Sequence, residues 1–136
     1  MAMSDSELGL AVKRLQVKQH RAATEALRRL DVSLVQWDAL RHLHGHPGAS
    51  QHDLAVLTFQ TDQAFGTLAA RLEARGLIRR CSGVGRAIRP ELTDEGERVY
   101  AEGLQVTERL VQESFSVLNP DERAAFAGML ERLLAR

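Results

Sequence analysis

The chain has 136 residues, 44% of them hydrophobic and only three of them proline, which is enough for one modest core and argues against a disordered protein. No apolar run approaches the ~20 residues of a membrane-spanning helix, and the polar start lacks the basic and apolar regions of a signal peptide, so we expect a cytoplasmic protein without a membrane partner. The net charge is zero, and the single cysteine, Cys81, excludes an internal disulfide.

The charge is unevenly distributed along the chain. Residues 1–89 carry 13 Lys/Arg against 8 Asp/Glu, whereas residues 90–136 carry 5 against 10. The segment 71–89 holds six arginines and one acid, Glu73. Local clustering of cations is what a nucleic-acid partner requires, although charged runs also occur on solvated helix surfaces.

Two helices are predicted in the first third of the chain. Ser4 and Glu7 have the spacing of a capping box, so a first helix is expected to begin there and to run to residue 30. Ser33 and Gln36 form a second capping box before the next helix, which Gly45, Pro47 and Gly48 end. The apolar stripe of the first helix is Leu8, Ala11, Leu15, Ala22, Ala26 and Leu30.

A helix-turn-helix is predicted next. Ser50 can cap a short helix, Thr58-Phe59-Gln60 forms a tight connection, and Thr61 can cap a second helix with apolar positions at intervals of three and four residues. Gly76 is placed to end that helix in a left-handed conformation.

A β-hairpin and two further helices complete the chain. Residues 77–81 and 86–92 are predicted as strands around a glycine turn, and Pro90 confines its strand to a sheet edge. A long fifth helix begins at Asp94 with a broad apolar face, and Asn119-Pro120 begins a sixth. The apolar positions of the fifth helix are expected to be Val99, Tyr100, Val106, Leu110, Val111, Val117 and Leu118.

This order predicts one domain, 1–136, of mainly α class with a small β-hairpin wing. The winged lobe covers residues 33–92, and the helices of residues 4–30 and 94–135 lie outside it. In such a fold the second helix of the helix-turn-helix enters the DNA major groove, and a basic hairpin lies beside the phosphates. The arginines on this helix and hairpin are Arg71, Arg75, Arg79, Arg80, Arg86 and Arg89.

Three motifs carry a resemblance to a known family. They are Ser50-Gln51-His52-Asp53-Leu54-Ala55, then Arg71-Leu72-Glu73-Ala74-Arg75-Gly76-Leu77-Ile78, then Leu92-Thr93-Asp94-Glu95-Gly96. In this order and spacing they resemble the MarR (multiple antibiotic resistance regulator) family, whose patterns are roughly S-Q-x-x-L-A, r-L-e-x-x-G-L-I and L-T-x-x-G. The resemblance extends over nearly the whole chain.

The resemblance implies a homodimeric transcription regulator, most simply a repressor relieved by a ligand. Its outer helices would form the dimer interface, and two winged lobes would read a pseudo-palindromic duplex. The apolar faces of these helices exceed what one lobe can bury, and this agrees with a homodimer. The resemblance also implies a pocket for a small aromatic or phenolic molecule, with His20, Trp37 and Tyr100 as candidate lining residues.

The chain departs from the family at the wing and on the second helix of the motif. Val84 replaces the acid that often braces the wing arginine, here Arg86. Few side chains on the second helix can read bases; Gln63 suits adenine, and Thr67 suits a thymine methyl group or a phosphate. The candidate DNA-binding residues are Ser50, Gln51, Thr61, Gln63, Thr67, Arg71, Arg75, Arg86 and Arg89.

Other functions find less support in the sequence. The cluster His42, His44, His46 and His52 could bind a metal, and neighbouring arginines could activate Cys81 as a thiol sensor, but helix-end histidines and a half-buried strand thiol are the simpler interpretations. A winged helix can also bind protein instead of DNA. No catalytic constellation or nucleotide motif is present, so we expect no metal, no cofactor and no enzyme.

Overall fold

The structure is a computed structural model that describes residues 2–82, 85 and 87–136. The expectations for Val84 and Arg86 therefore lie outside the described residues. The elements in chain order are α1 (Asp5–Leu27), the short 3-10 helix η1 (Arg28–Leu30), α2 (Leu34–Gly45), α3 (Gln51–Leu57), α4 (Asp62–Ala74), β1 (Ile78–Ser82), β2 (Ile88–Leu92), α5 (Asp94–Phe115) and α6 (Pro120–Leu134).

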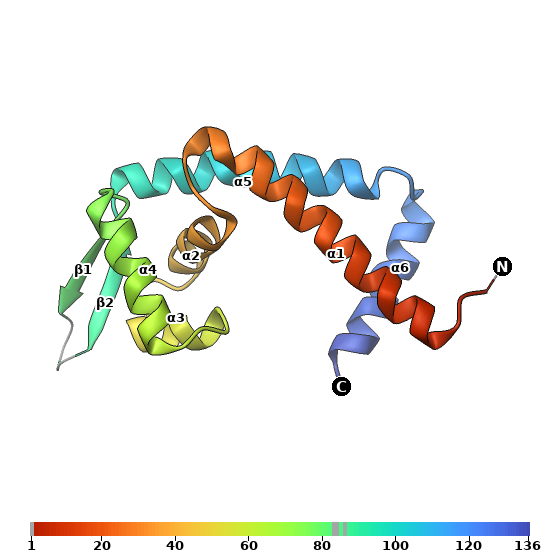
Figure 1. The fold of residues 1–136 in the computed structure, drawn as a ribbon, viewed down its shortest axis with the longest axis horizontal. Helices are drawn as coiled ribbons and strands as arrows, with labels where there is room; N and C mark the ends of the chain where they lie inside the picture. Colours follow the sequence, from red (N-terminus) through yellow and green to blue (C-terminus); the bar gives the residue numbers. More distant parts are fainter. Residues whose placement is uncertain (1, 83–84, 86) are drawn as a thin grey trace.

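The elements form a lobe, made of α2, α3, α4 and the hairpin, and an arm, made of α6 and the N-terminal half of α1. Figure 1 shows α2, α3, α4 and the hairpin gathered at one end beneath α5, while α6 descends from the other end of α5. Helices α1 and α5 pack against each other and link the two parts. The predicted fold class, mainly helical with a two-stranded hairpin, is confirmed. Within the described chain, no helix is both long enough and apolar enough to cross a membrane.

Side-chain caps fix where the helices begin. Ser4, Ser33, Ser50 and Asn119 each accept a hydrogen bond from the backbone N–H three residues later, and the side chain of that third residue accepts one in return. Each cap therefore satisfies amides that the first helical turn leaves unpaired. The capping boxes predicted at Ser4 and Ser33 are confirmed.

Two predicted helix ends are wrong by a few residues. The first α-helix ends at Leu27 and continues as η1, after which Asp31 takes a left-handed conformation with φ 56°. The fifth helix ends at Phe115, so Val117 and Leu118 do not belong to it, and the Val117 side chain is 84% exposed. Ser116 is the C-cap of α5 and Asn119 is the N-cap of α6; Pro120 disfavours the helical region at Asn119, so the two helices do not join into one.

The hydrophobic core lies in the lobe, under α5 and the end of α1. Trp37 and Val32 are both 4% exposed, as expected of the hydrophobic staple at the start of α2. The remaining buried side chains of the core are Leu27, Ala39, Leu40, Leu43, Leu54, Ala55, Phe65, Ala69, Leu72, Leu77, Ile78 and Val99.

The third motif of the sequence docks α5 onto this lobe. The Thr93 N–H donates to the Leu77 carbonyl at 3.1 Å, and the Thr93 hydroxyl caps α5 by accepting from the Gly96 N–H. A Cβ on Gly96 would lie 2.0 Å from the Leu77 carbonyl oxygen. Only glycine allows the first turn of α5 to approach the strand so closely, which gives the L-T-x-x-G motif its physical reason.

Candidate nucleic-acid interface and adjoining cavity

Helix α4 presents a polar face to solvent from a packed position in the lobe. Phe65 and Leu72 are buried on its inner face. Gln63, Thr67 and Arg71 are exposed and recur every four residues, so they share the outer face. The predicted base readers and one predicted phosphate contact thus lie on one accessible stripe.

Three of the nine candidate DNA-binding residues have structural roles in the helix-turn-helix. The hydroxyls of Ser50 and Thr61 accept the backbone N–H groups that cap α3 and α4. The Gln51 side chain lies against α4, where its Nε2 is 3.2 Å from the position of a Cβ on Gly66. Its Oε1 is buried and accepts no hydrogen bond from the described residues. These residues fix how α3 and α4 cross.

The candidate arginines that the structure describes, Arg71, Arg75 and Arg89, do not form one cluster. Arg75 pairs with Asp31 at 3.5 Å, roughly 20 Å along the helix from the start of α4. Arg89, on β2, donates to the Gly48 carbonyl. Arg71 is exposed at the end of α4. The structure thus separates Arg75 from the N-terminal half of α4, where base contacts occur in helix-turn-helix proteins.

A carboxylate anchors the wing to α4. Glu73 accepts hydrogen bonds from the Arg80 backbone N–H at 2.8 Å and from its guanidinium at 3.0 and 3.1 Å. These hydrogen bonds hold the pKa of the Glu73 carboxyl below its ordinary value. Arg80 is therefore engaged within the lobe, while its neighbour Arg79 is exposed.

The four histidines predicted as a possible metal cluster do not converge on one site, although the His42 and His46 rings stack with their centroids 6.1 Å apart. His42 and His46 contact carbonyls of their own helix, His44 contacts Glu97 at 3.0 Å, and His52 contacts Asp62 at 2.8 Å. Among the described residues, no three His, Cys, Asp or Glu side chains come together as metal ligands. Cys81 is exposed on β1, so the expectation of a half-buried strand thiol is wrong.

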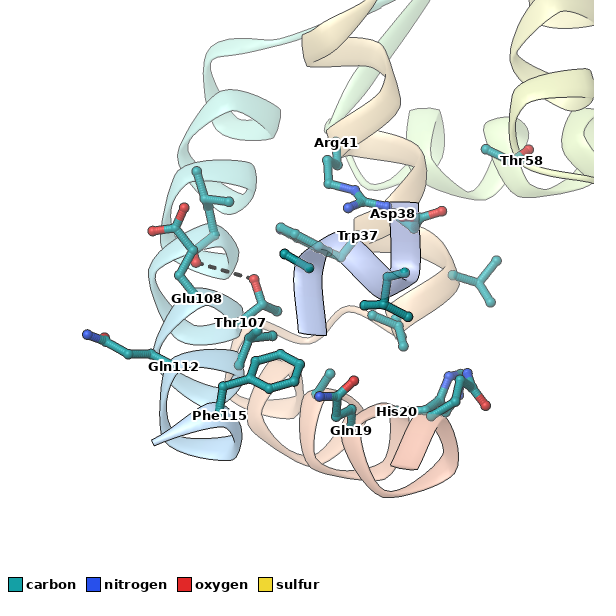
Figure 2. A pocket seen from close by; sticks show the side chains of 18 of the residues that line it. Gln19, His20, Trp37, Asp38, Arg41, Thr58, Thr107, Glu108, Gln112 and Phe115 are labelled. Atoms are coloured by element: carbon teal, nitrogen blue, oxygen red, sulfur yellow. Dashed lines mark hydrogen bonds and ion pairs between the residues drawn. The ribbon is translucent and has the colours of Figure 1, made fainter. Parts of the chain in front are cut away.

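A cavity of about 1100 Å³ separates the lobe from the arm. Its walls come from α1, α2, α5 and α6 and from the turn between α3 and α4, as Figure 2 shows in close-up. The predicted lining residues His20 and Trp37 lie in these walls. Tyr100 does not line the cavity. Its ring stacks on His44 at 4.2 Å, and its carbonyl accepts a hydrogen bond from the Trp37 indole at 3.2 Å.

Charged side chains at the cavity were not predicted from the sequence. The Arg41 guanidinium lies 5.7 Å from the centre of the Trp37 ring and pairs with Asp38. On the opposite wall, α5 contributes an inner stripe that mixes apolar and polar residues: Leu104, Thr107, Glu108, Val111, Gln112 and Phe115. The helical spacing of this stripe was the signal that could have revealed the wall.

The arm exposes apolar side chains that the chain itself does not cover. Helix α6 buries no residue, and Leu133 and Leu134 are 68% and 82% exposed. On α1, Leu8 and Val12 are also exposed. An exposed apolar surface of this kind marks an interaction site.

Comparisons with known proteins agree with this architecture. The MarR family profile matches residues 30–87. The transcriptional repressor Rv2887 of Mycobacterium tuberculosis (strain ATCC 25618 / H37Rv) is 28% identical over 131 residues, which cover 95% of this chain and 94% of the relative.

Solved structures extend the likeness to nearly the whole fold. The structure of Rv2887 with p-aminosalicylic acid superposes with a TM-score of 0.75 at 28% identity, covering 93% of this chain and 97% of that one. A mutant of MarR from Escherichia coli, solved with operator DNA, gives a TM-score of 0.83 at 23% identity and covers 93% of each chain.

Proposed function

We propose that the chain is a member of the MarR family of winged helix-turn-helix regulators, whose profile matches residues 30–87, and that it acts as a homodimeric transcription repressor and not as an enzyme. It binds a pseudo-palindromic DNA duplex and releases it when a small aromatic ligand occupies the cavity. The observation that carries the proposal is the exposed stripe of Gln63, Thr67 and Arg71 on a packed second helix of a helix-turn-helix.

DNA binding follows from how α4 is held. Its inner face is buried in the core while its outer face is accessible. The helix can therefore enter the major groove while the rest of the lobe stays folded. Arg71 and the wing arginines supply phosphate contacts, which orient the lobe on the duplex, and Gln63 and Thr67 supply base contacts. Arg86 is included among the phosphate-binding residues only because of its position in the sequence.

Dimerisation follows from the exposed apolar residues of α6 and α1. Burying them against a second copy removes apolar surface that no element of the same chain covers. A two-fold dimer also places two lobes at the spacing of successive major grooves, roughly 34–36 Å apart.

Ligand binding follows from the chemistry of the cavity walls. Trp37 offers an aromatic surface, and Arg41 offers a guanidinium that suits a carboxylate. The relative Rv2887 was solved with p-aminosalicylic and salicylic acids, which are aromatic carboxylates. Because the walls belong to both lobe and arm, an occupant that favours one placement of the lobes shifts the dimer away from its DNA-binding form.

The DNA-binding part is tested by selecting bound duplexes from a random pool and measuring affinity against salt. If about six to ten phosphate contacts form, affinity falls roughly 10³- to 10⁵-fold between 50 and 200 mM salt. Gln63→Ala should change the selected sequence, whereas Arg71→Ala should weaken all duplexes alike. A salt slope near zero would instead support a module that binds protein.

The ligand part is tested by titrating salicylate into the protein–operator complex. Salicylate is expected to release the duplex and to bind the free protein, as measured by calorimetry. Arg41→Gln should weaken that binding while leaving DNA affinity without salicylate unchanged. Release by salicylate that is identical in the Arg41→Gln variant would remove this guanidinium from the site.

A further inference from the structure

An interhelical pair joins the two helices of the helix-turn-helix on their exposed side. The His52 Nδ1 lies 2.8 Å from the Asp62 Oδ1, and both side chains are 69% exposed. His52 is the second residue of α3, and Asp62 is the first residue of α4. The pair therefore stands where the second helix of the motif meets base edges.

Asp62 carries a charge that DNA binding must accommodate. A carboxylate among phosphates is repelled, unless a cation neutralises it or a donor on the DNA pairs with it. The major-groove edge of cytosine presents such a donor, the N4 amino group, and Asp is a residue type that accepts from it. The contact with His52 uses Oδ1, and the carboxylate has a second oxygen to offer.

We propose that Asp62 is a base-reading residue that selects a cytosine, and that His52 is its positioning residue, which makes this recognition depend on proton uptake. Protonated His52 holds the carboxylate in place and neutralises it beside the phosphates. Neutral His52 leaves the pair with a net charge of −1 at the duplex. This inference rests on the proposed DNA-binding function and adds two residues to its site.

The surroundings of His52 favour the protonated form. The hydrogen bond and the charge of Asp62 raise the pKa of His52 above its ordinary value of 6.5, and the nearby charge of Asp53 acts in the same direction. Asp53 is itself held by the Ser50 cap. Phosphates of a bound duplex raise the pKa of His52 further, because a negative potential favours the imidazolium.

The expected pH dependence has a definite sign. Since the bound form holds the His52 proton more tightly than the free form, binding takes up a proton and affinity falls as pH rises above the ordinary imidazole range. One linked proton gives at most about a tenfold loss of affinity per pH unit. The experiments therefore follow whether the His52–Asp62 pair takes up a proton when the duplex binds.

The first experiment measures affinity for the selected duplex by fluorescence anisotropy from about pH 6 to pH 8.5 at constant salt. His52→Asn keeps an N–H donor near the Nδ1 position but cannot titrate, so it should flatten the pH dependence. His44→Asn is the matched control, because His44 also contacts a carboxylate, Glu97 at 3.0 Å, but on α2 and α5 instead of α3 and α4. The His44→Asn variant should keep the wild-type dependence of affinity on pH.

The second experiment repeats the sequence selection with Asp62→Asn. Loss of a cytosine preference at one position of each half-site is the expected result, since the amide no longer offers two acceptor oxygens. An unchanged selected sequence, or the same pH slope in wild type and His52→Asn, would overturn the inference and reduce the pair to a surface ion pair. Absence of duplex binding by the wild type at every pH would overturn the proposed function itself.

Discussion

The lobe and the arm both contain helices with apolar residues at helical spacing, but they differ in whether the chain buries those residues. In the lobe, Phe65, Leu54 and Leu40 are almost fully buried by neighbouring elements of the same chain. In the arm, α6 has apolar residues at helical spacing and buries none of them. The lobe thus carries its own core, whereas the arm would obtain one only from the second copy of the proposed dimer.

This difference explains why the cavity lies where it does. Its walls include Trp37 from the lobe core and Phe126 and Leu130 from α6, so it lies between a part that has its own core and a part whose apolar side chains the described chain leaves exposed. A molecule in the cavity therefore acts on the junction of two regions with separate sources of stability. Four variants, each compared with a control or with the wild type, test this comparison.

The largest effect is expected where α5 joins the lobe. In Gly96→Ala the new Cβ would lie 2.0 Å from the Leu77 carbonyl oxygen, and a backbone atom cannot move aside as a side chain can. We expect a loss of about 3 kcal/mol or more in the free energy of unfolding, measured by urea denaturation, because overpacking against backbone is at the upper end of its range.

A second glycine on the arm is the control for this variant. Beyond its chain neighbours and the backbone of its own helix, no atom lies within 4 Å of a Cβ built on Gly128 of α6, so Gly128→Ala should stabilise the helix by up to about 1 kcal/mol. Equal destabilisation by both substitutions would show that the lobe and the arm do not differ in the way described.

A large effect on association is expected on α6. Met129 and Leu133 are exposed and one helical turn apart, so Met129→Glu with Leu133→Glu places four carboxylates in a dimer interface. The dissociation constant should rise at least about 100-fold, which is roughly 3 kcal/mol. Sedimentation should then show a species near the chain mass of 15.1 kDa in place of one of about twice that mass.

Ala124→Glu is the matched control, because this exposed residue lies on the side of α6 opposite to Leu133. It should leave the dimer intact. A wild-type chain that sediments only as a 15.1 kDa species would contradict the role given to the arm.

A smaller effect is expected at the root of the wing. The pKa of Glu73 is lowered by its hydrogen bonds from Arg80, so its contribution to stability is present above the ordinary value of 4.5 and is lost as pH falls through the lower, folded-state pKa. Glu73→Gln should reduce the drop in melting temperature between neutral and acidic pH. The same acid dependence in both proteins would show that the anchor adds no stability.

Sequence signals with a local physical cause predicted the fold well. Capping boxes placed the helix starts at Ser4 and Ser33, and Gly76 ends α4 with φ 74° as expected. Those signals work because a cap or a left-handed residue acts within a few positions of itself. The end of α5 was placed too late, because the apolar periodicity continues past Phe115 although the helix does not.

The candidate sites were harder to predict because they depend on contacts between elements. Gln51 was expected on the DNA-binding surface, but Gly66 leaves room for its side chain to lie against α4. Tyr100 was expected in the cavity, and its ring instead stacks on His44, while Arg41 lines a wall. The pattern of one helix does not reveal which residue of a neighbouring helix fills the space beside it.

Substitution of Phe59 gives the smallest expected effect on stability. The sequence does not reveal that this residue adopts a left-handed backbone conformation. Helices α3 and α4 end in the same motif, in which the residue after the cap donates to a carbonyl three positions back and the next residue donates to one five positions back. In α4 the left-handed position is Gly76 with φ 74°, whereas in α3 it is Phe59 with φ 56°. The ring is 99% exposed, so no contact within the chain offsets the unfavourable conformation.

Phe59→Gly should therefore stabilise the lobe slightly. Relief of the left-handed conformation contributes about 1–2 kcal/mol, and the added freedom of glycine in the unfolded chain removes about 0.4–1 kcal/mol of it. Phe59→Ala separates the two possible roles, because it removes the ring but keeps the Cβ that causes the strain, and it should leave the melting temperature unchanged. If both variants instead lower the melting temperature or weaken the dimer, the ring contacts the second copy, and the lobe depends on association as the arm does.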